Sequence, residues 1–484
     1  MTSRLVIVSN RVATPQSGVR ARAGGLAVAV KAALKHRNGL WFGWSGEVRG
    51  NGAPPENGGA PRITHHHRLA FALIDLGGAD YQEYYNGFAN RVLWPILHYR
   101  VDLQDYSRAD ASGYLRVNRL FAEKLSPLLN DDDVIWVHDY HLMPLARELR
   151  GRGHLNPIGF FLHIPCAPPD ILQALPHHES VLGALSFFDL VGFQTQRDCD
   201  NFGEYLLSRG ARRGRGHDFE FEGRRTRLGA FPVGIETAVF ARLARRASRL
   251  PLIQTLRESL GDVRLVIAVD RLDYSKGIAN RIHAFDLFLE TCPDWLCKVT
   301  LLQITPKSRG EIKEYAEMES AVAELVGKVN GRHGQPHWTP IRYVNQTFPR
   351  AALAGFYRVA DATLVTPCRD GMNLVAKEFL AAQDPDDPGV LVLSEFAGAA
   401  AELDRALIVN PHEIEGVAAA LRRALDMPLD ERRARHAPMM AHLRAADIAR
   451  WADDFLTALA EARPHPGLLE GMRAWFGDLV NPPP

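Results

Sequence analysis

The chain has 484 residues, of which 46% are hydrophobic and 23% are charged, and its formal net charge is +1 at pH 7. This length predicts about two to three domains, and the composition excludes a disordered, fibrous or membrane-embedded chain. A net charge so close to zero argues against nucleic acid or an anionic membrane as a partner.

Signals for export and for metal binding are weak. The apolar run Arg4–Ser9 meets Arg11 before the core of a signal peptide could form. The five cysteines are scattered and lack the paired spacing of a zinc site, so we expect reduced thiols. A cytoplasmic protein without a metal or cofactor is therefore expected.

Short β-branched or aromatic runs alternate with longer amphipathic runs, which predicts strand–helix–strand units and parallel sheets. In the first half we expect strands at Leu5–Ser9, Leu40–Trp44, Val134–His138, Ile158–His163, Leu190–Phe193 and Leu228–Val233. Between them we expect helices, for example at Leu26–Leu34, Tyr114–Leu129 and Gln196–Arg209. A second series of strands is expected at Leu265–Val269, Val299–Ile304, Ile341–Val344, Ala362–Thr366, Val390–Leu393 and Leu407–Val409.

The two series predict an α/β fold with two doubly wound, Rossmann-like domains that face each other across a cleft. The proline-glycine turn at Pro232–Glu236 marks the junction, which predicts an N-terminal domain over residues 1–235 and a second domain over residues 236–450. Residues 451–484 are expected to form a C-terminal helical segment that packs back toward the N-terminal domain. Because such sheets bind ligands beyond the carboxyl ends of their strands, residues at strand ends are the candidates for function.

Two further segments are expected to be surface features. Residues 208–227 place arginine and glycine clusters around the alternating piece Asp218–Glu222, which predicts a solvated hairpin; a weak polyanion contact is the alternative. The triplet His65–His67 has no carboxylate or cysteine at ligand spacing, so metal binding is not expected there.

Two glycines follow the end of the first expected strand. Gly24 and Gly25 open the helix expected at Leu26–Leu34. Without side chains they let backbone N–H groups approach a phosphate, and the helix dipole favours negative charge there. A plain glycine turn is the alternative.

Two cations lie on the loop after the strand Leu265–Val269. Arg271 and Lys276 are five residues apart, and together they could clamp a diphosphate and stabilise the charge on a departing nucleotide. The alternative is a salt-bridged loop in which Asp270 and Asp273 are the partners.

Residues 369–378, which include several polar side chains, follow the strand expected at Ala362–Thr366. Asn373 is expected to cap a helix whose first N–H groups, at Leu374–Val375, are available to a ligand. Glu378 lies one turn further on and could accept ribose hydroxyls, while Asp370 could reach a sugar hydroxyl. A capped helix with an exposed glutamate is the alternative.

Histidines end two successive strands of the first half. Val134–His138 leads into Asp139 and His141, and the strand after it ends at His163. Polar residues at neighbouring strand ends indicate a ligand site, although a buried histidine that is satisfied within the core is the alternative for His163.

Twelve sequence motifs are spread from Arg4 to about Leu459, and the main ones are SNR at Ser9, AGGLAV at Ala23, GLWFGWSGE at Gly39, EYYNGFAN at Glu83, WVHDYHLMP at Trp136, GFFLHIP at Gly159, RLDYSKG at Arg271, SRG at Ser308 and RDGMNLVAKE at Arg369. Together they resemble the bacterial trehalose-6-phosphate synthases, a family of retaining glycosyltransferases with the GT-B fold.

The resemblance implies two substrates, UDP-glucose as donor and glucose 6-phosphate as acceptor. It implies that the donor contacts Gly24, Gly25, Arg271, Lys276, Phe348, Leu374, Val375, Ala376, Lys377 and Glu378. Among these, Phe348 would lie near uracil and Glu378 would bind the ribose. It implies that the acceptor contacts Arg11, Tyr85, Trp94, Asp139 and Arg309, with its phosphate held by the two arginines. It also matches Trp44 to a tryptophan of the cleft. His163 and Asp370 would hold hydroxyls of the transferred glucose, and with Arg271 and Lys276 they complete the expected catalytic set.

The family reaction retains the anomeric configuration without a clear protein nucleophile, because the leaving UDP phosphate takes the acceptor proton. This differs from the two-carboxylate chemistry of retaining glycosidases. Three alternatives stay open: a same-fold pseudo-glycosyltransferase acting on cyclitols, a synthase that prefers another nucleotide-glucose donor, and a non-catalytic sugar-phosphate sensor. The sequence leaves the oligomeric state open, and a homo-oligomer is compatible with it.

Two positions depart from the commoner bacterial pattern. Asp270 stands where glutamate often precedes the arginine, and Cys166-Ala167-Pro168 stands where Phe-Pro-Thr is frequent. Neither change removes an expected ligand.

Overall fold

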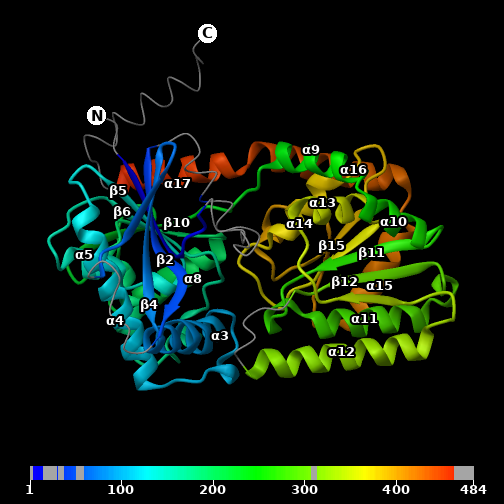
Figure 1. Ribbon diagram of the computed structural model, residues 1–484, viewed down its shortest axis with the longest axis horizontal. Helices are drawn as coiled ribbons and strands as arrows, with labels where there is room; N and C mark the ends of the chain where they lie inside the picture. Colours follow the sequence, from blue (N-terminus) through cyan, green and yellow to red (C-terminus); the bar gives the residue numbers. More distant parts are fainter. Residues whose placement is uncertain (1–3, 15–29, 31–37, 51–58, 307–312, 463–484) are drawn as a thin grey trace, which may run out of the picture. The chain divides into compact units, whose positions relative to one another are not determined.

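The computed structural model describes residues 4–14, 30, 38–50, 59–306 and 313–462 (Figure 1). The chain forms two compact units: a first unit of residues 1–233 with 451–484, and a second unit of residues 234–450. Gly24, Gly25, Arg309 and most of the helix expected at Leu26–Leu34 lie outside the described residues.

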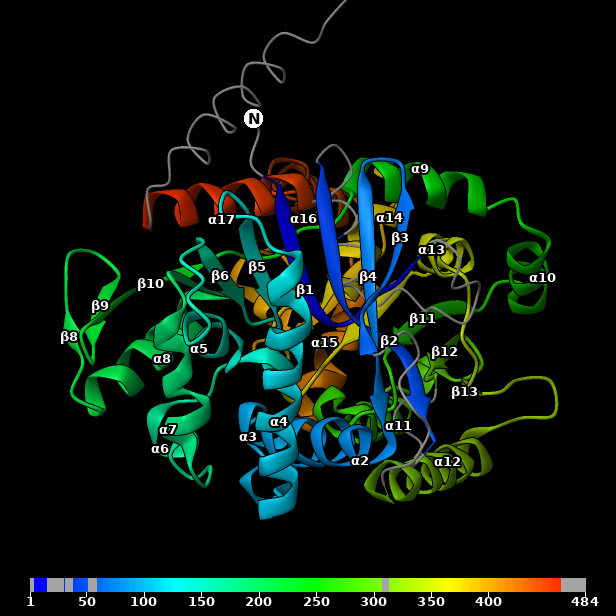
Figure 2. The same ribbon diagram turned by 60° about the vertical axis from the view of Figure 1, so that its left-hand side comes forward.

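The first unit is built on a ten-stranded sheet whose strands follow the order β3-β4-β2-β1-β5-β6-β7-β10-β9-β8. Its central strands are parallel, whereas β3 pairs antiparallel with β4, and β8, β9 and β10 pair antiparallel in turn. In Figure 2, strands β1, β2 and β4 run side by side. The strands are β1 Leu5–Arg11, β2 Gly39–Arg49, β3 Arg62–His66, β4 Leu69–Gly77, β5 Val134–His138, β6 Ile158–Phe161, β7 Leu190–Phe193, β8 Arg212–Arg213, β9 Asp218–Phe221 and β10 Arg224–Ala230.

The helices of the first unit include one long π-helix, η2 (Tyr81–Leu93), which packs on α4. Ser107 begins α4 by accepting a hydrogen bond from the N–H of Asp110, and Thr195 begins α8 in the same way. The α-helices are α2 Gly78–Asp80, α3 Trp94–Leu97, α4 Arg108–Leu125, α5 Leu145–Arg150, α6 Pro169–Leu172, α7 His178–Val181 and α8 Gln196–Ser208. The short 3-10 turns are η3 Val101–Leu103, η4 Ser126–Leu128, η5 Tyr140–Leu142 and η6 Gly183–Phe187.

The last described helix, α17 (Ile448–Ala462), enters the first unit at Trp451 and packs on its sheet. The Phe455 ring stacks on Trp136 with centroids 4.5 Å apart. A Cβ atom at Gly159 or at Gly192 would lie only 2.7 Å from the Phe455 ring, so these two strand glycines make room for it.

The second unit holds a six-stranded parallel sheet with the order β13-β12-β11-β14-β15-β16. The order reverses between β11 and β14, as in doubly wound dinucleotide-binding sheets. Its strands are β11 Arg264–Val269, β12 Val299–Ile304, β13 Ile341–Val344, β14 Ala362–Val365, β15 Val390–Ser394 and β16 Leu407–Val409.

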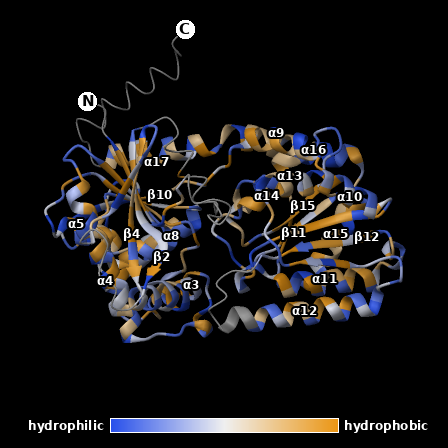
Figure 3. Cartoon of the chain, in the orientation of Figure 1, coloured by the Kyte–Doolittle hydropathy of each residue, from blue (hydrophilic) through white to orange (hydrophobic). Residues whose placement is uncertain are grey.

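Helices cover both faces of this second sheet (Figure 1), and the strands between them are largely apolar (Figure 3). The α-helices are α9 Thr237–Ala247, α10 Pro251–Leu260, α11 Ile278–Thr291, α12 Lys313–His333, α13 Arg350–Val359, α14 Leu374–Ala382, α15 Ile414–Asp426 and α16 Leu429–Ala445. The 3-10 turns are η7 Tyr274–Lys276, η8 Pro293–Trp295 and η9 Gly398–Ala401. None of the described helices is long and apolar enough to cross a membrane.

The predicted class, α/β with two doubly wound sheets, is confirmed, but the first sheet is larger than predicted. Strands β3 and β4 were not predicted. The β3 strand is polar and exposed, because it is the edge of the sheet, and it holds His65 and His66. The strand predicted at Leu228–Val233 begins earlier, since the start of β10 pairs with β9 in a hairpin. The predicted helix Tyr114–Leu129 is α4, which starts earlier and ends at Leu125.

Candidate active site

The candidate residues of the first unit follow its central strands. Strands β1 and β5 are neighbours, and the chain runs from them toward opposite edges of the sheet. Arg11 ends β1, Asp139 follows β5, and His163 lies two residues beyond β6. Because these strands are parallel, all three residues lie at the carboxyl ends of the strands, where doubly wound sheets bind ligands.

An aromatic row connects four of the candidates in this unit. The Arg11 guanidinium lies 5.8 Å from the centre of the Trp44 ring, and that ring lies 5.8 Å from the Tyr85 ring. Tyr85 in turn stacks on His141, with an interplanar angle of 11°. Rings of this kind offer flat faces for a sugar, while Arg11 brings a cation to the end of the row.

Trp94 extends this row from the start of α3. Its buried ring lies 5.8 Å from Tyr140 and 4.1 Å from His98, centroid to centroid. Tyr140 contacts the ring of His141, so Trp94 joins the same cluster as Tyr85.

Asp139 adopts a backbone conformation that is rare for a residue with a side chain. Its φ is 75°, and its N–H donates to the carbonyl of Phe161 at 2.8 Å. Its Oδ1 accepts the backbone N–H of His163 at 3.3 Å. Strained residues of this kind are concentrated at functional sites, which agrees with a role for Asp139 at this strand end.

His163, which is partly buried, pairs with the fully buried His138, the last residue of β5. The two rings share a hydrogen bond of 3.1 Å between Nδ1 of His138 and Nε2 of His163. Burial lowers the pKa of His163 to about 3 and lowers the pKa of His138 well below its ordinary value. Both rings are therefore neutral at pH 7 and can act only as neutral hydrogen-bond groups.

The candidates of the second unit meet where its strand order reverses. Lys276 lies on the loop after β11 and Asp370 on the loop after β14, and β11 and β14 are adjacent. The Lys276 Nζ atom donates to Oδ2 of Asp370 at 2.5 Å, although 94 residues separate the two in sequence. The expected cationic loop and the expected hydroxyl-binding aspartate thus lie side by side.

Asn373 stands at the predicted helix start but does not cap it with its side chain. It has a φ of 70° and makes no side-chain hydrogen bond to the first turn of α14. Its Nδ2 instead donates to Oδ2 of Asp370 at 3.0 Å, the oxygen that Lys276 also binds. Asn373 therefore occupies the N-cap position as predicted, but its Oδ1, the atom that would accept a helix N–H, has no partner among the described residues.

The salt-bridged loop of the alternative interpretation is present in part, because Arg271 pairs with Asp273 but Asp270 pairs elsewhere. The Arg271 side chain is 49% exposed, and its Nη2 lies 4.0 Å from Oδ2 of Asp273. Asp273 is buried and accepts the N–H and hydroxyl of Ser275. Asp270 pairs with a different arginine, Arg281. The Arg271 guanidinium is therefore accessible to a ligand.

Arg281, which was not among the predicted site residues, lies beside the loop that carries Lys276. Its side chain is completely buried, and it lies on α11. It binds four groups around the loop, namely Oδ2 of Asp270 at 2.7 Å, Oγ1 of Thr366 at 3.0 Å, Oε1 of Gln303 at 3.1 Å and the carbonyl of Lys276 at 3.2 Å. A signal was present, because an arginine between Ile278 and Ile282 stands on the buried face of an otherwise apolar helix start.

The start of α14 supplies the remaining donor candidates. The N–H groups of Leu374 and Val375 lie in the first turn, where no acceptor within the helix is available, whereas Ala376 bonds to Asn373. Burial raises the pKa of Glu378 to about 7, and the charge of Arg350, whose Nε lies 3.9 Å from Oε1, opposes this shift. Phe348 packs edge-on against Phe356, with centroids 5.1 Å apart.

Lys377 differs from its neighbours on α14. Its side chain is completely buried and donates to Oε2 of Glu402 at 2.5 Å, and His442 bonds to the other oxygen of that carboxylate. Only the backbone of Lys377 is thus available for the donor contact that the resemblance implies.

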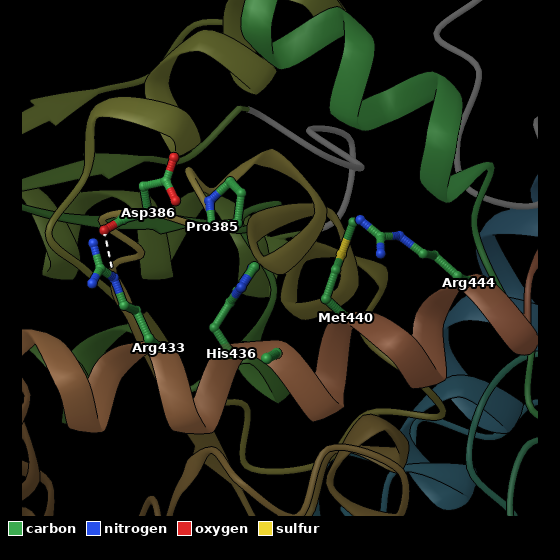
Figure 4. A pocket seen from close by; sticks show the side chains of 7 residues that line it. Pro385, Asp386, Arg433, His436, Met440 and Arg444 are labelled. Atoms are coloured by element: carbon green, nitrogen blue, oxygen red, sulfur yellow. Dashed lines mark hydrogen bonds between the residues drawn. The ribbon is translucent and has the colours of Figure 1, made fainter.

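Two other features of the second unit do not involve the candidate residues. Carboxylate oxygens of Asp286 and Glu290 and a ring nitrogen of His333 lie within 4.8 Å of one another, but Arg332 pairs with both acids and offsets part of their charge. A pocket along α16 (Figure 4) shares no residue with the loops described above, and it is lined by Pro385, Asp386, Arg433, His436, Ala437, Met440 and Arg444.

Known proteins resemble this chain over almost its whole length. The trehalose-6-phosphate synthase of Sinorhizobium fredii is 53% identical over 460 residues, which are 94% of this chain and 98% of the relative. The alpha,alpha-trehalose-phosphate synthase (UDP-forming) of Burkholderia xenovorans, solved with glucose-6-phosphate, has a TM-score of 0.91, 47% identity and coverage of 94% and 100%. A trehalose-6-phosphate structure from E. coli, bound with UDP-2-fluoro glucose, has a TM-score of 0.89, 46% identity and coverage of 96% and 100%.

These likenesses and the two doubly wound sheets define the chain as a glycosyltransferase with the GT-B fold. The model of glycosyltransferase family 20 matches residues 3–461, so the chain belongs to that family.

Proposed function

We propose that this enzyme transfers glucose from UDP-glucose to glucose 6-phosphate with retention, giving alpha,alpha-trehalose 6-phosphate and UDP. The observation that carries the proposal is the cationic loop at the strand-order reversal of the second sheet, where Lys276 meets Asp370. The relatives that share the fold at 46% and 47% identity are solved with a UDP-sugar analogue and with glucose-6-phosphate.

The second unit is proposed to bind the donor, with residues 236–450 as the nucleotide-sugar domain. Arg271 and Lys276 would hold the diphosphate, because one is accessible and the other has its ammonium group at the strand end. The N–H groups of Leu374 and Val375, in the first turn of α14, would add neutral donors, with the backbone of Ala376 and Lys377 beside them. Glu378 would accept the ribose hydroxyls, Phe348 would lie near uracil, and Gly24 and Gly25 would approach the diphosphate.

The first unit is proposed to bind the acceptor, with residues 1–235 as its domain and residues 451–484 as a C-terminal segment. Arg11 and Arg309 would bind the phosphate of glucose 6-phosphate as charge-assisted partners. Tyr85 and Trp94, which belong to one aromatic cluster, would shape the sugar pocket. Asp139 would accept a sugar hydroxyl.

The proposed chemistry needs no protein nucleophile. His163 and Asp370 would hold hydroxyls of the transferred glucose. When the bond to the anomeric carbon breaks, negative charge grows on the UDP phosphate, and Arg271 and Lys276 would stabilise it. That phosphate oxygen would take the proton of the acceptor hydroxyl as the new bond forms on the same face. When the donor binds, the Lys276 ammonium would either leave Asp370 for the phosphate or bind both groups at once. The enzyme is proposed to act in the cytoplasm.

The test is turnover by the purified full-length chain with glucose 6-phosphate and a panel of UDP-, GDP- and ADP-glucose and a nucleotide-bound cyclitol. We expect UDP release with UDP-glucose and a 1,1-linked product whose two anomeric centres are both α by NMR. Release only with the cyclitol donor would identify the pseudo-glycosyltransferase, and preference for GDP- or ADP-glucose would correct the donor. Absence of turnover with every donor would favour the non-catalytic sensor.

A further inference from the structure

The hydrogen bond between the His138 and His163 rings can determine which ring nitrogen carries a proton. His138 ends β5 and is completely buried, whereas His163 is only partly buried. One hydrogen bond joins Nδ1 of His138 to Nε2 of His163 at 3.1 Å. Since both rings are neutral at pH 7, this bond contains one proton, which belongs to one ring or the other.

The surroundings of His138 decide which ring carries that proton. Its other nitrogen, Nε2, is buried and has no hydrogen-bond partner among the described residues. The rings beside it belong to Trp136, at 4.7 Å between centroids, and Trp451, at 6.3 Å. An indole N–H is a donor and offers no lone pair, so neither tryptophan can accept a proton from Nε2.

Two arrangements of the shared proton are available, and they differ in cost. If His163 donates, His138 must carry its own hydrogen on Nε2, which would bury an N–H group without an acceptor. If His138 donates from Nδ1, its Nε2 is a bare lone pair among aromatic rings. Orphaned buried N–H groups are rarer in proteins than under-satisfied acceptors, so the second arrangement is favoured.

The consequence for His163 follows from the chemistry of a neutral imidazole. Its Nε2 accepts from His138, so its hydrogen resides on Nδ1. Within the described part of the chain, the bonds of His163 are those of Nε2 and of its backbone, which leaves Nδ1–H to a ligand. Asp139 holds the backbone N–H of the same residue, so two consecutive residues at the end of β5 fix His163.

We propose that His138 is a positioning residue that holds His163 in the Nδ1–H tautomer, so that His163 presents a hydrogen-bond donor to a hydroxyl oxygen of the sugar. The sugar as ligand of His163 rests on the proposed function; the tautomer itself does not. The helix α17 supports this arrangement, because Trp451 packs beside both histidine rings.

The first experiment measures the tautomer directly in the ligand-free, full-length protein. Long-range proton–nitrogen NMR of the 15N-labelled chain distinguishes protonated from bare ring nitrogens, and a His163→Asn sample identifies the His163 signals. We expect Nδ1 of His163 to be protonated and Nε2 bare. A protonated Nε2, or shifts averaged between the two tautomers, would overturn the proposal. This result is independent of which substrate the enzyme uses.

The second experiment removes the donor and then restores it. His138→Phe keeps a ring of similar size without nitrogen, and His138→Asn places an amide nitrogen two bonds from Cβ, as Nδ1 is. Loss of one neutral hydrogen bond predicts a fall of about tenfold in kcat for the phenylalanine variant, with the asparagine variant within about threefold of the wild type. The matched control, Trp451→Phe, alters the aromatic packing and should leave the tautomer unchanged.

The outcomes separate positioning from simple packing. A merely structural role would lower kcat and the midpoint of thermal unfolding together in both His138 variants, and that result would contradict the proposal. If neither variant folds, the NMR measurement on the wild type decides. If the wild type turns over no donor while its His163 is the Nδ1–H tautomer, the proposed function fails and the positioning role of His138 stands.

Discussion

The candidate residues of the two units are held in place by different forces. In the first unit, neutral groups dominate: a buried histidine pair, a strained aspartate backbone and a row of aromatic rings around Tyr85. In the second unit, Lys276 pairs with Asp370, and the buried Arg281 pairs with Asp270. The difference matches the proposed ligands, because a sugar ring is recognised by flat apolar faces and neutral hydrogen bonds, whereas a diphosphate needs cations held ready by counter-charges.

Arg281→Met tests whether buried charge holds the second unit together, and it should have the largest effect. It leaves Asp270 buried without its partner, so we expect the free energy of unfolding to fall by about 3–5 kcal/mol at pH 8. Urea denaturation measures this. The control Arg332→Met removes an arginine that is half exposed, for which we expect at most about 1 kcal/mol. Equal losses of unfolding free energy in the two variants would contradict a special role for the buried ion pair.

Glu378→Gln tests the second unit through its pH dependence. The pKa of Glu378 is raised from 4.5 to about 7 in the folded chain, so the folded state binds the extra proton between these two pH values. Stability from this group is therefore lost as pH rises from about 4.5 to 7. Relative to the wild type, the free energy of unfolding of the glutamine variant should increase by at most about 3 kcal/mol between pH 4.5 and pH 8. If the free energy of unfolding depended on pH in the same way in both proteins across this range, the raised pKa of Glu378 would be contradicted.

Lys276→Ala tests the role of charge in turnover rather than in folding. Removing one donor to developing charge should lower kcat on the order of a hundredfold. Steady-state kinetics with UDP-glucose measures the effect, and circular dichroism checks the fold. The control Lys328→Ala removes an exposed lysine of α12 and should leave kcat unchanged. An unchanged kcat in the Lys276 variant would remove this residue from the mechanism.

Arg11→Ala and Arg271→Ala form a pair that sharpens the division between the two units. Loss of a charge-assisted contact, worth roughly 1.5–3 kcal/mol, predicts a KM increase of roughly 10- to 150-fold. The Arg11 variant should show it for glucose 6-phosphate and the Arg271 variant for UDP-glucose. Each variant is the control for the other, and equal effects on both KM values would contradict separate acceptor and donor roles.

Much of the second unit was predictable because its strands are short, apolar and separated by helices. The ends of β11 and β14 were placed within a residue or two, and those ends bring Lys276 and Asp370 together across 94 residues. The ion pair itself was not predictable, because a linear pattern does not say which carboxylate faces a lysine. For the same reason the buried side chain of Lys377, bonded to Glu402, was not foreseen.

The first unit was harder to predict where its structure depends on contacts that are distant in sequence. The polar edge strand β3 has no apolar pattern, because only one neighbour and solvent surround it. The positive φ of Asp139 has no glycine or asparagine to announce it. His138 was placed at the end of its strand, but its bond to His163 depends on the pairing of β5 with β6.

The most direct test of the account is a crystal structure of the full-length enzyme with UDP bound. We expect the diphosphate at the loops after β11 and β14, with the Lys276 ammonium within hydrogen-bonding distance of a phosphate oxygen and Glu378 on the ribose. UDP bound elsewhere, for example in the pocket along α16, with Lys276 still held by Asp370 alone, would contradict it.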